Sequence, residues 1–334
     1  MQTVMVKGRV FNYSHTLGRN ASSGPGFRHP MDIALAPNGH IYVVSRGDEY
    51  MPCQRVSIQT IDEEFIGEFG SYGQGDGQFI WPTACAIDRQ GNVYVADEWL
   101  QRISIFDKGG KFLGKWGTYG SKKGQLNGPT GLVFDADDNL LVTENLNHRV
   151  QKFTKEGKSL QAWGSEGQSE GQFNRPWGID IDAKGDVYVA DWHNHRIQKF
   201  TADGKHLATI GAPGEGKGDL KFPSDVTVDK DGDIYVANWW KNTVEVFDST
   251  GAHLTTFIGD AEKLSKWAQQ SIDANPDYKR ARLLVKNVQQ EWRFNRPTAI
   301  AVTDKGQVLV VENQRMRIQV YQKEENWTDP QFNL

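Results

Sequence analysis

The residues with the clearest potential for chemistry follow short apolar runs of the chain. Arg46 comes directly after IYVVS, Glu98 directly after VYVAD, and His193 two residues after a second VYVAD. An arginine offers a planar, permanently charged fork for a carboxylate or an oxyanion. A glutamate or a histidine can act as a general base or activate water. Tyr50 lies in the polar stretch after Arg46 and could assist it, so these four residues are the predicted catalytic groups.

Several tryptophans occupy related positions. Trp192 and Trp239 directly follow apolar runs, and Trp177 follows a proline. A concave apolar site with a few convergent polar groups is the usual form of a small-molecule site. Some tryptophans could instead pack between structural units, as we expect for Trp116 and Trp163. The predicted substrate-binding residues are Trp99, Trp177, Trp192, Trp239, Asp48 and Asp225.

Six prolines mark the repeating elements that must position these residues: Pro30, Pro82, Pro129, Pro176, Pro223 and Pro297. The three middle spacings are 47 residues each, and the outer spacings are 52 and 74. A fixed period in this range indicates a repeat architecture. Each unit holds short β-rich runs joined by Gly and Asp turns, which is typical of a four-stranded antiparallel sheet.

The repeat predicts an all-β fold, a single six-bladed β-propeller over residues 1–322. The last unit has only three runs, so we expect the N-terminal segment 3–12 to supply its fourth strand and close the ring. The expected blades are 30–70, 82–117, 129–164, 176–211, 223–259 and 297–322. Residues 260–293 lack β-alternation and predict a helical insertion with helices over 261–272 and 278–292, either a surface decoration or a lid. Residues 323–334 form the expected C-terminal tail.

Residues that recur in every unit are expected to be structural. An acid ends the second run of most units, and an arginine follows five residues later: Asp97 and Arg102, Glu144 and Arg149, Asp191 and Arg196, Glu312 and Arg317. The fifth unit has Asn238 and Thr243 at these positions, so acid and arginine are lost together. This covariation predicts turn-bracing ion pairs. His148 and His195 share one repeat position and are expected to belong to the scaffold.

The repeated runs resemble a known family. VYVADWHNHRIQKF, LLVTENLNHRVQKF and VYVADEWLQRISIF are similar to NHL repeats, with linkers such as WGSEGQSEGQFNRP between them. The resemblance covers about residues 24 to 322 and implies the propeller fold. NHL propellers include enzymes, RNA-binding modules and protein scaffolds, so the resemblance implies no single function.

The segment Arg46–Asp48 is also similar to the arginine-bearing loop of the peptidyl-α-hydroxyglycine α-amidating lyases, which are propellers with a central zinc. In those enzymes the arginine is catalytic, which implies a catalytic role for Arg46. They place zinc-binding histidines directly after the blade-opening prolines. Here those positions hold Met31, Thr83, Thr130, Trp177, Ser224 and Thr298, so a three-histidine zinc centre is absent.

Composition and charge limit the classes of partner that we expect. The net charge is −4, with 38 basic and 42 acidic residues, and no basic stripe indicates nucleic acid or an anionic membrane. The N-terminus has no apolar signal region, so a soluble, cytoplasmic protein is expected. Two cysteines are too few for a disulfide framework. A divalent ion on the axis, calcium or zinc, has carboxylate candidates in Asp32, Glu98 and Asp225, although no spacing requires it.

Two functions remain open from the sequence. The first is a lyase or hydrolase acting on a small organic substrate, a carboxylate or an aromatic molecule, in an axial pocket lined by tryptophan with Arg46 and carboxylates. The alternative is a protein- or peptide-binding scaffold without catalysis, since tryptophan and arginine are also typical binding anchors. No partner domain accompanies the blades, and this favours the enzyme.

Overall fold

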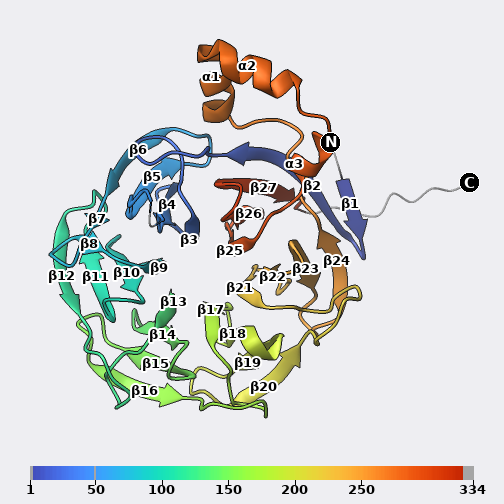
Figure 1. Ribbon diagram of the computed structural model, residues 1–334. Helices are drawn as coiled ribbons and strands as arrows, with labels where there is room; N and C mark the ends of the chain where they lie inside the picture. The colour runs from blue at the N-terminus through green and yellow to red at the C-terminus, as the bar shows by residue number, and fades with distance from the viewer. Residues whose placement is uncertain (1–2, 49, 326–334) are drawn as a thin grey trace, which may run out of the picture.

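Six antiparallel sheets stand around a central axis in the computed structural model, which describes residues 3–48 and 50–325 (Figure 1). The first strand of each sheet lines the axis, and the later strands lie progressively farther out. The predicted six-bladed propeller is therefore confirmed.

Each blade uses consecutive strands. Blade 1 contains β3 (Pro30–Leu35), β4 (His40–Ser45), β5 (Arg55–Thr60) and β6 (Phe65–Phe69), and the short strands β7 (Ser71–Tyr72) and β8 (Gln78–Phe79) follow it. Blade 2 contains β9 (Pro82–Ile87), β10 (Val93–Asp97), β11 (Arg102–Phe106) and β12 (Phe112–Trp116). Blade 3 contains β13 (Pro129–Phe134), β14 (Leu140–Glu144), β15 (Arg149–Phe153) and β16 (Ser159–Trp163). Blade 4 contains β17 (Pro176–Ile181), β18 (Val187–Asp191), the 3-10 turn η1 (Trp192–Asn194), β19 (Arg196–Phe200) and β20 (His206–Ile210). Blade 5 contains β21 (Pro223–Val228), β22 (Ile234–Asn238), β23 (Thr243–Phe247) and β24 (His253–Phe257).

The last blade joins the two ends of the described chain. Its strands are β25 (Pro297–Val302), β26 (Gln307–Glu312), β27 (Arg317–Lys323), β2 (Arg9–Leu17) and β1 (Thr3–Val6). N-terminal closure is thus confirmed, but the closing strand is β2 rather than the expected segment 3–12. The reason is a two-residue turn at Lys7 and Gly8, both with positive φ, which folds β1 back onto β2 as a hairpin.

Hydroxyl groups link neighbouring inner strands around the axis. The residue after a blade-opening proline donates to the carbonyl of the next such proline in four blades: Thr83 to Pro129, Thr130 to Pro176, Ser224 to Pro297 and Thr298 to Pro30, at 2.8–3.1 Å. The two remaining positions hold Met31 and Trp177. Their side chains instead line the axial cavity described below. The repeat is therefore interrupted where the candidate site lies.

The predicted ion pairs form in three of the four blades. Their nitrogen–oxygen distances are 2.7 Å for Arg149 and Glu144, 2.9 Å for Arg196 and Asp191, and 2.5 Å for Arg317 and Glu312. In blade 2 the prediction is wrong. Asp97 accepts from the backbone N–H groups of Ile80 and Trp81, while Arg102 donates to three backbone carbonyls. The histidines are also structural: Nδ1 of His148 accepts from the N–H of Arg175.

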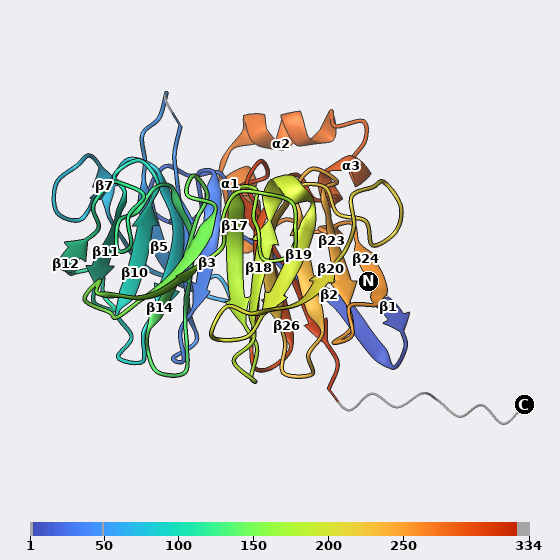
Figure 2. The same ribbon diagram turned by 90° about the horizontal axis from the view of Figure 1, so that it is seen from below.

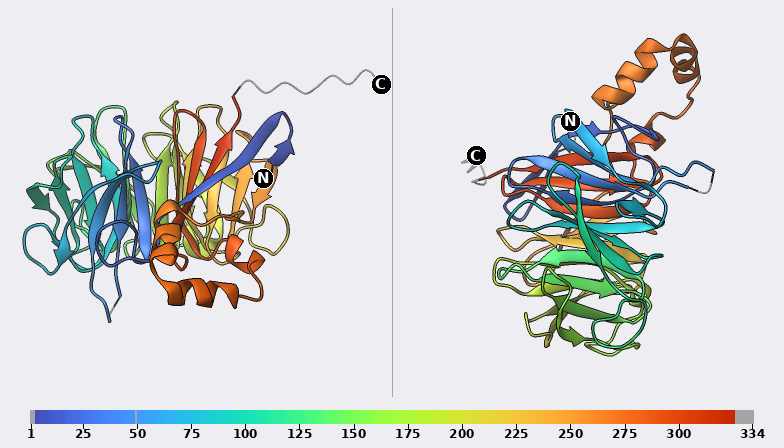
Figure 3. Two further views of the ribbon diagram at one scale, coloured as in Figure 1. Left: turned by 90° about the horizontal axis from the view of Figure 1, so that it is seen from above. Right: turned by 90° about the vertical axis from the view of Figure 1, so that its left-hand side faces the viewer.

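Residues 260–293 form the predicted helical insertion, with α1 (Lys266–Ala274), α2 (Pro276–Leu283) and α3 (Gln289–Trp292). It lies at the outer rim of the ring, beside blades 1 and 6, and not over the axis (Figures 1 and 3). Trp267 packs edge-on against Phe65 of β6 with a centroid distance of 6.5 Å, and Ser265 donates to the carbonyl of Gly18 at 2.5 Å. These contacts fit a peripheral decoration better than a lid.

The expected tail begins one residue inside β27, and its residues 326–334 lie outside the described residues. Within the described part of the chain, no helix has the length and apolar character needed to cross a lipid bilayer.

Candidate functional site

A cavity of about 340 Å³ opens at one end of the propeller axis. It lies on the face that carries the loops after the second strand of each blade, including the loop between β4 and β5, seen at the top of Figure 2. The lining residues are His29, Met31, Arg46, Gly47, Trp177, Trp192, Ser224, Trp239, Arg296, Thr298 and Asn313.

Blades 4 and 5 supply the apolar half of this cavity. The ring centroids of Trp177 and Trp192 are 5.4 Å apart, and those of Trp192 and Trp239 are 5.2 Å apart. Trp177 is the second residue of β17, while Trp192 and Trp239 directly follow β18 and β22. The three tryptophans that the sequence placed in a pocket are therefore brought together. They form a continuous aromatic wall suited to a flat or apolar molecule.

Blades 6 and 1 supply the cationic half. The guanidinium of Arg296 lies over the ring of Trp239, 4.6 Å from its centroid. Arg46 enters from the loop after β4. His29 has Nδ1 at 3.3 Å from Oδ1 of Asn313 and Nε2 at 3.5 Å from the Asp48 carboxylate. The site thus adds two guanidinium groups and one imidazole to the aromatic wall, and the guanidinium of Arg296 is stacked directly on that wall.

Arg46 is held in place by two contacts. Its guanidinium covers the ring of Trp81 at 4.7 Å, and Nη2 lies 3.3 Å from Oε2 of Glu98. Asn145 donates to the other oxygen of Glu98 at 3.2 Å. Burial lowers the pKa of the Arg46 guanidinium, and the Glu98 carboxylate opposes that shift. A partly dehydrated, oriented cation attracts an anion more strongly than one in bulk water.

Three predicted site residues lie away from the cavity. Tyr50 is 95% exposed. His193 is exposed and packs edge-on against Phe222, where burial and the nearby Arg175 lower the pKa of its imidazole. Trp99 packs against Trp81 at 4.9 Å, on the far side of Arg46. The reason is shared: each follows the second strand by two or more residues, so the turn carries it outward.

Asp48 and Glu98 lie just behind the cavity wall. Asp48 forms an ion pair with Arg28, whose hydrogen bond lowers the pKa of the Asp48 carboxyl. It also accepts the backbone N–H groups of Tyr50 and Met51 and so shapes the loop. Asp48 therefore orients His29, and Glu98 orients Arg46. Both were predicted to act directly on substrate or metal, and the structure gives them positioning contacts.

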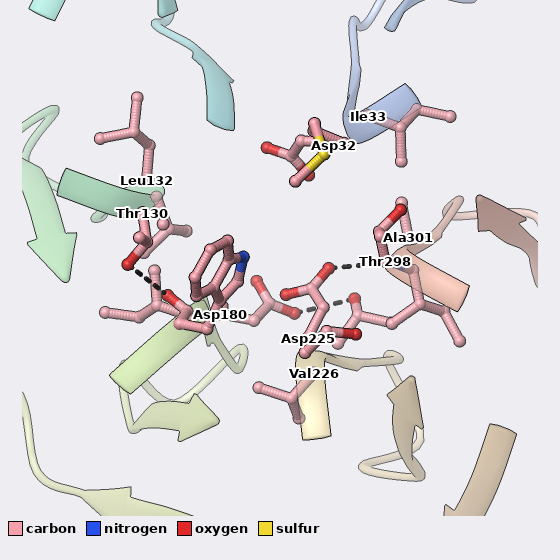
Figure 4. A pocket seen from close by; sticks show the side chains of 18 of the residues that line it. Asp32, Ile33, Thr130, Leu132, Asp180, Asp225, Val226, Thr298 and Ala301 are labelled. Atoms are coloured by element: carbon pink, nitrogen blue, oxygen red, sulfur yellow. Dashed lines mark hydrogen bonds between the residues drawn. The ribbon is translucent and has the colours of Figure 1, made fainter. Parts of the chain in front are cut away.

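Deeper on the axis, a smaller cavity of about 120 Å³ is lined by three carboxyl groups, Asp32, Asp180 and Asp225 (Figure 4). Burial raises the pKa of Asp32 to about 7 and that of Asp180 to about 6. Burial and the neighbouring Asp32 raise the pKa of Asp225 strongly. Asp32 accepts the N–H of Cys85 at 2.7 Å, and Asp225 accepts that of Ile300 at 2.9 Å, so each ties its blade to the next.

The predicted metal ligands do not converge. Asp32 and Asp225 line the deeper cavity, whereas Glu98 is engaged with Arg46 and Asn145. Among residues 3–48 and 50–325, no group of three or more His, Cys, Asp or Glu side chains is arranged to hold a metal ion. The structure therefore does not bring the three candidate ligands of a divalent ion together. Asp225, also predicted to bind substrate, lies below the upper cavity.

Sequence reasoning missed His29 and Arg296. Both stand directly before a blade-opening proline, with φ of 46° and 53°. The other four positions of this type hold Trp81, Gly128, Arg175 and Phe222. A comparison of this position across the repeats, like those made for the residues after the proline, would have exposed His29 and Arg296 as blade-specific.

Comparisons with known proteins agree with this fold. Four segments match the NHL repeat: residues 126–153, 173–200, 220–247 and 294–321. A search of curated protein sequences finds no significant match.

Three solved structures illustrate the likeness. A catalytically inactive virginiamycin B lyase from Staphylococcus aureus with quinupristin is 16% identical, with a TM-score of 0.54, over 93% of this chain and 88% of that one. A streptogramin B lyase is 12% identical, with a TM-score of 0.59, over 94% and 98%. A structural genomics protein from Bacteroides thetaiotaomicron is 18% identical, with a TM-score of 0.63, over 95% and 76%. At these identities the likeness shows the fold alone. The chain carries NHL repeats and folds as a six-bladed β-propeller.

Proposed function

We propose that this protein is a lyase that binds a small organic anion with an aromatic or apolar body in the axial cavity. One observation carries the proposal: the cavity is divided into a tryptophan wall and a cationic wall. The first comprises Trp177, Trp192 and Trp239, and the second contains Arg46 and Arg296. Among the described lining residues there is no carboxylate to repel an anion.

The two walls select complementary parts of one ligand. Indole surfaces bind aromatic or aliphatic groups by apolar contact and stacking. A guanidinium group binds a carboxylate through paired, charge-assisted hydrogen bonds. Arg46 is kept in orientation by Glu98 and Trp81, so little conformational freedom is lost when an anion binds.

The polar wall also suits a proton transfer. The lining residue His29 carries an imidazole, the side chain most often used as a general base, and Asp48 lies 3.5 Å from its Nε2. In the proposed elimination, the substrate displaces Oδ1 of Asn313 from Nδ1 of His29, and this nitrogen takes the proton from the carbon next to the carboxylate while Nε2 donates to Asp48. Arg46 stabilises the charge that develops on the carboxylate oxygens. The electrons of the broken C–H bond form a carbon–carbon double bond, and the β-carbon releases its substituent with the electron pair. Two of the solved structures with a similar fold are lyases, and this supports the reaction class.

Binding is tested with N-acetyl-tryptophan and its neutral amide by isothermal titration calorimetry. We expect the carboxylate to bind at least tenfold more tightly than the amide, and Arg46→Ala or Arg296→Ala to remove that preference. Arg175→Ala is the matched control, since Arg175 also precedes a blade-opening proline but lies outside the cavity lining. Equal binding of acid and amide, or no binding, would contradict the anion site and favour the protein-binding alternative.

The reaction is tested with 3-acetoxy-3-phenylpropanoate. Elimination gives cinnamate and acetate, and cinnamate is followed by its ultraviolet absorbance. Hydrolysis gives acetate and 3-hydroxy-3-phenylpropanoate, without a new double bond. We expect cinnamate from the wild type and none from His29→Gln. Acetate release without cinnamate would replace the lyase by a hydrolase at the same site.

A further inference from the structure

A second, larger cavity of about 620 Å³ lies over blades 2 and 3. Its walls come from the same loop class as those of the axial cavity, so both open on one face of the propeller. Its lining residues are Gln74, Trp81, Glu98, Trp99, Leu100, Gln101, Tyr119, Asn127 and Leu146.

Large apolar side chains are unusually exposed here. Trp99 is 56% exposed, Tyr119 69%, and Trp81 and Leu146 42% each. By contrast, Trp116 of blade 2 packs between blades, 4.9 Å from Phe153 of blade 3, and its indole N–H donates to the carbonyl of Lys155. Clustered exposed aromatic groups are typical of binding sites rather than of stability. The blade-specific residues of this cavity therefore need a ligand to cover them.

Arg46 joins the two cavities. It lines the axial cavity, while its guanidinium covers Trp81 and contacts Glu98, both of which line the second cavity. A molecule whose carboxylate binds Arg46 therefore lies next to the second cavity. The shared wall makes the two cavities neighbouring parts of one surface.

We propose that the second cavity binds a neutral aromatic arm of the same substrate whose carboxylate is held by Arg46. The substrate class is then a two-armed aromatic carboxylate, with one arm on Trp192 and Trp239 and the other on Trp99 and Tyr119. This inference rests on the proposed function of the axial cavity. The axial cavity alone is near the lower size limit of small-molecule sites, and the two combined approach the upper limit.

The charged residues of each cavity indicate which arm of the substrate it binds. Glu98 is the one charged side chain among the described residues that line the second cavity, so an anionic arm is disfavoured there. The axial cavity has the opposite character, with Arg46 and Arg296. The carboxylate therefore belongs in the axial cavity, and the second arm carries no negative charge.

The test uses two probes that share a carboxylate and one indole: N-acetyl-tryptophan, with one aromatic arm, and N-(indole-3-acetyl)-tryptophan, with two. Calorimetry on the wild type should show the two-armed probe binding at least tenfold more tightly. Trp99→Ala should reduce its affinity to that of the one-armed probe, and leave the one-armed probe unchanged. Tyr278→Ala is the control, because Tyr278 is 57% exposed in the rim insertion and lines neither cavity.

The outcomes separate this inference from the proposed function. If the one-armed probe binds and both probes have equal affinity, or Trp99→Ala leaves the two-armed probe unchanged, the second subsite is overturned while the axial site stands. If neither probe binds, the axial site fails and the inference with it. Each substituted residue is exposed, so we expect unchanged melting temperatures, which will show that the fold is intact.

Discussion

The guanidinium of Arg46 lies 3.3 Å from the carboxylate of Glu98, at the boundary between the two cavities. The Arg46 side chain is 23% exposed and the Glu98 side chain 18%. A pair this far removed from water holds its orientation, and removing one partner leaves the other poorly solvated. Glu98 is therefore a positioning residue for Arg46.

This relationship predicts a coupling between stability and binding. Arg46→Ala should lower the free energy of unfolding by about 1 kcal/mol, because Glu98 loses its partner. Adding Glu98→Gln should recover most of that loss without restoring anion binding, since the amide needs no counter-charge. Urea unfolding of the two single variants and the double variant measures the coupling. Independent, additive effects would show that the pair does not act as a unit.

A second cationic contact joins the last two blades. The ammonium of Lys323, at the end of β27, lies 2.6–2.8 Å from the carboxylates of Asp229, Asp231 and Asp233 in blade 5. Arg9 also pairs with Asp233 at 2.8 Å, so Lys323→Met removes the cation beside Asp229 and Asp231 in particular, and we expect a loss of about 3 kcal/mol of unfolding free energy. The measurement is the urea midpoint and its slope.

Lys230→Met provides the comparison for Lys323. Lys230 pairs with Glu325 at 2.5 Å, but both side chains are at least half exposed, 56% and 50%. Water screens an exposed pair of this kind, so Lys230→Met should destabilise the protein much less than Lys323→Met. Equal losses in the two variants would mean that burial of the Lys323 ammonium adds nothing to the contact between blades 5 and 6.

The repeat made the fold predictable, because six copies of one unit reveal which positions are structural. The ion pairs, the scaffold histidines and the tryptophan wall all follow from reading one position across the blades. Two features could not be read in that way. The hairpin at Lys7 and Gly8 occurs once, so no second copy reveals it. Asp97 changed its partner without changing its residue type.

The prediction of the site residues was partly wrong for a different reason. The number of residues between a loop side chain and the end of its strand decides whether that side chain faces the axis or solvent. A difference of one or two residues changes the direction. Trp192 directly follows its strand and lines the cavity, whereas His193, one residue later, is exposed. Type and spacing identified the correct loops. Side-chain direction required the three-dimensional course of each turn.

The helical insertion provides a third prediction. Residues 268–288, between Trp267 and the α3 helix, are replaced by a short Gly-Ser linker that leaves the contacts of Trp267 and Trp292 in place. Because the insertion lies at the rim, the dissociation constant of N-acetyl-tryptophan should change less than twofold. A tenfold weakening in calorimetry would show that the insertion acts as a lid in solution.

The axial carboxyls predict how stability depends on pH. The pKa of Asp32 in the folded protein is about 7 and that of Asp180 about 6, above the ordinary value near 4. The folded state therefore binds protons more tightly than the unfolded state. Stability contributed by these groups is present below about pH 4 and is lost as the pH rises through 6 and 7. We expect a decline on the order of 1–3 kcal/mol across this window.

Asp32→Asn isolates this effect. The amide oxygen still accepts the N–H of Cys85, but it no longer loses a proton. The variant should therefore be more stable than the wild type at pH 8 and nearly equal to it at pH 4, when melting temperatures are measured from pH 4 to 8. Asp180 and Asp225 line the same cavity and keep titrating in the variant, so its curve should flatten without becoming level. Parallel curves for the two proteins would show that Asp32 ionises normally, with water in the cavity compensating for its burial.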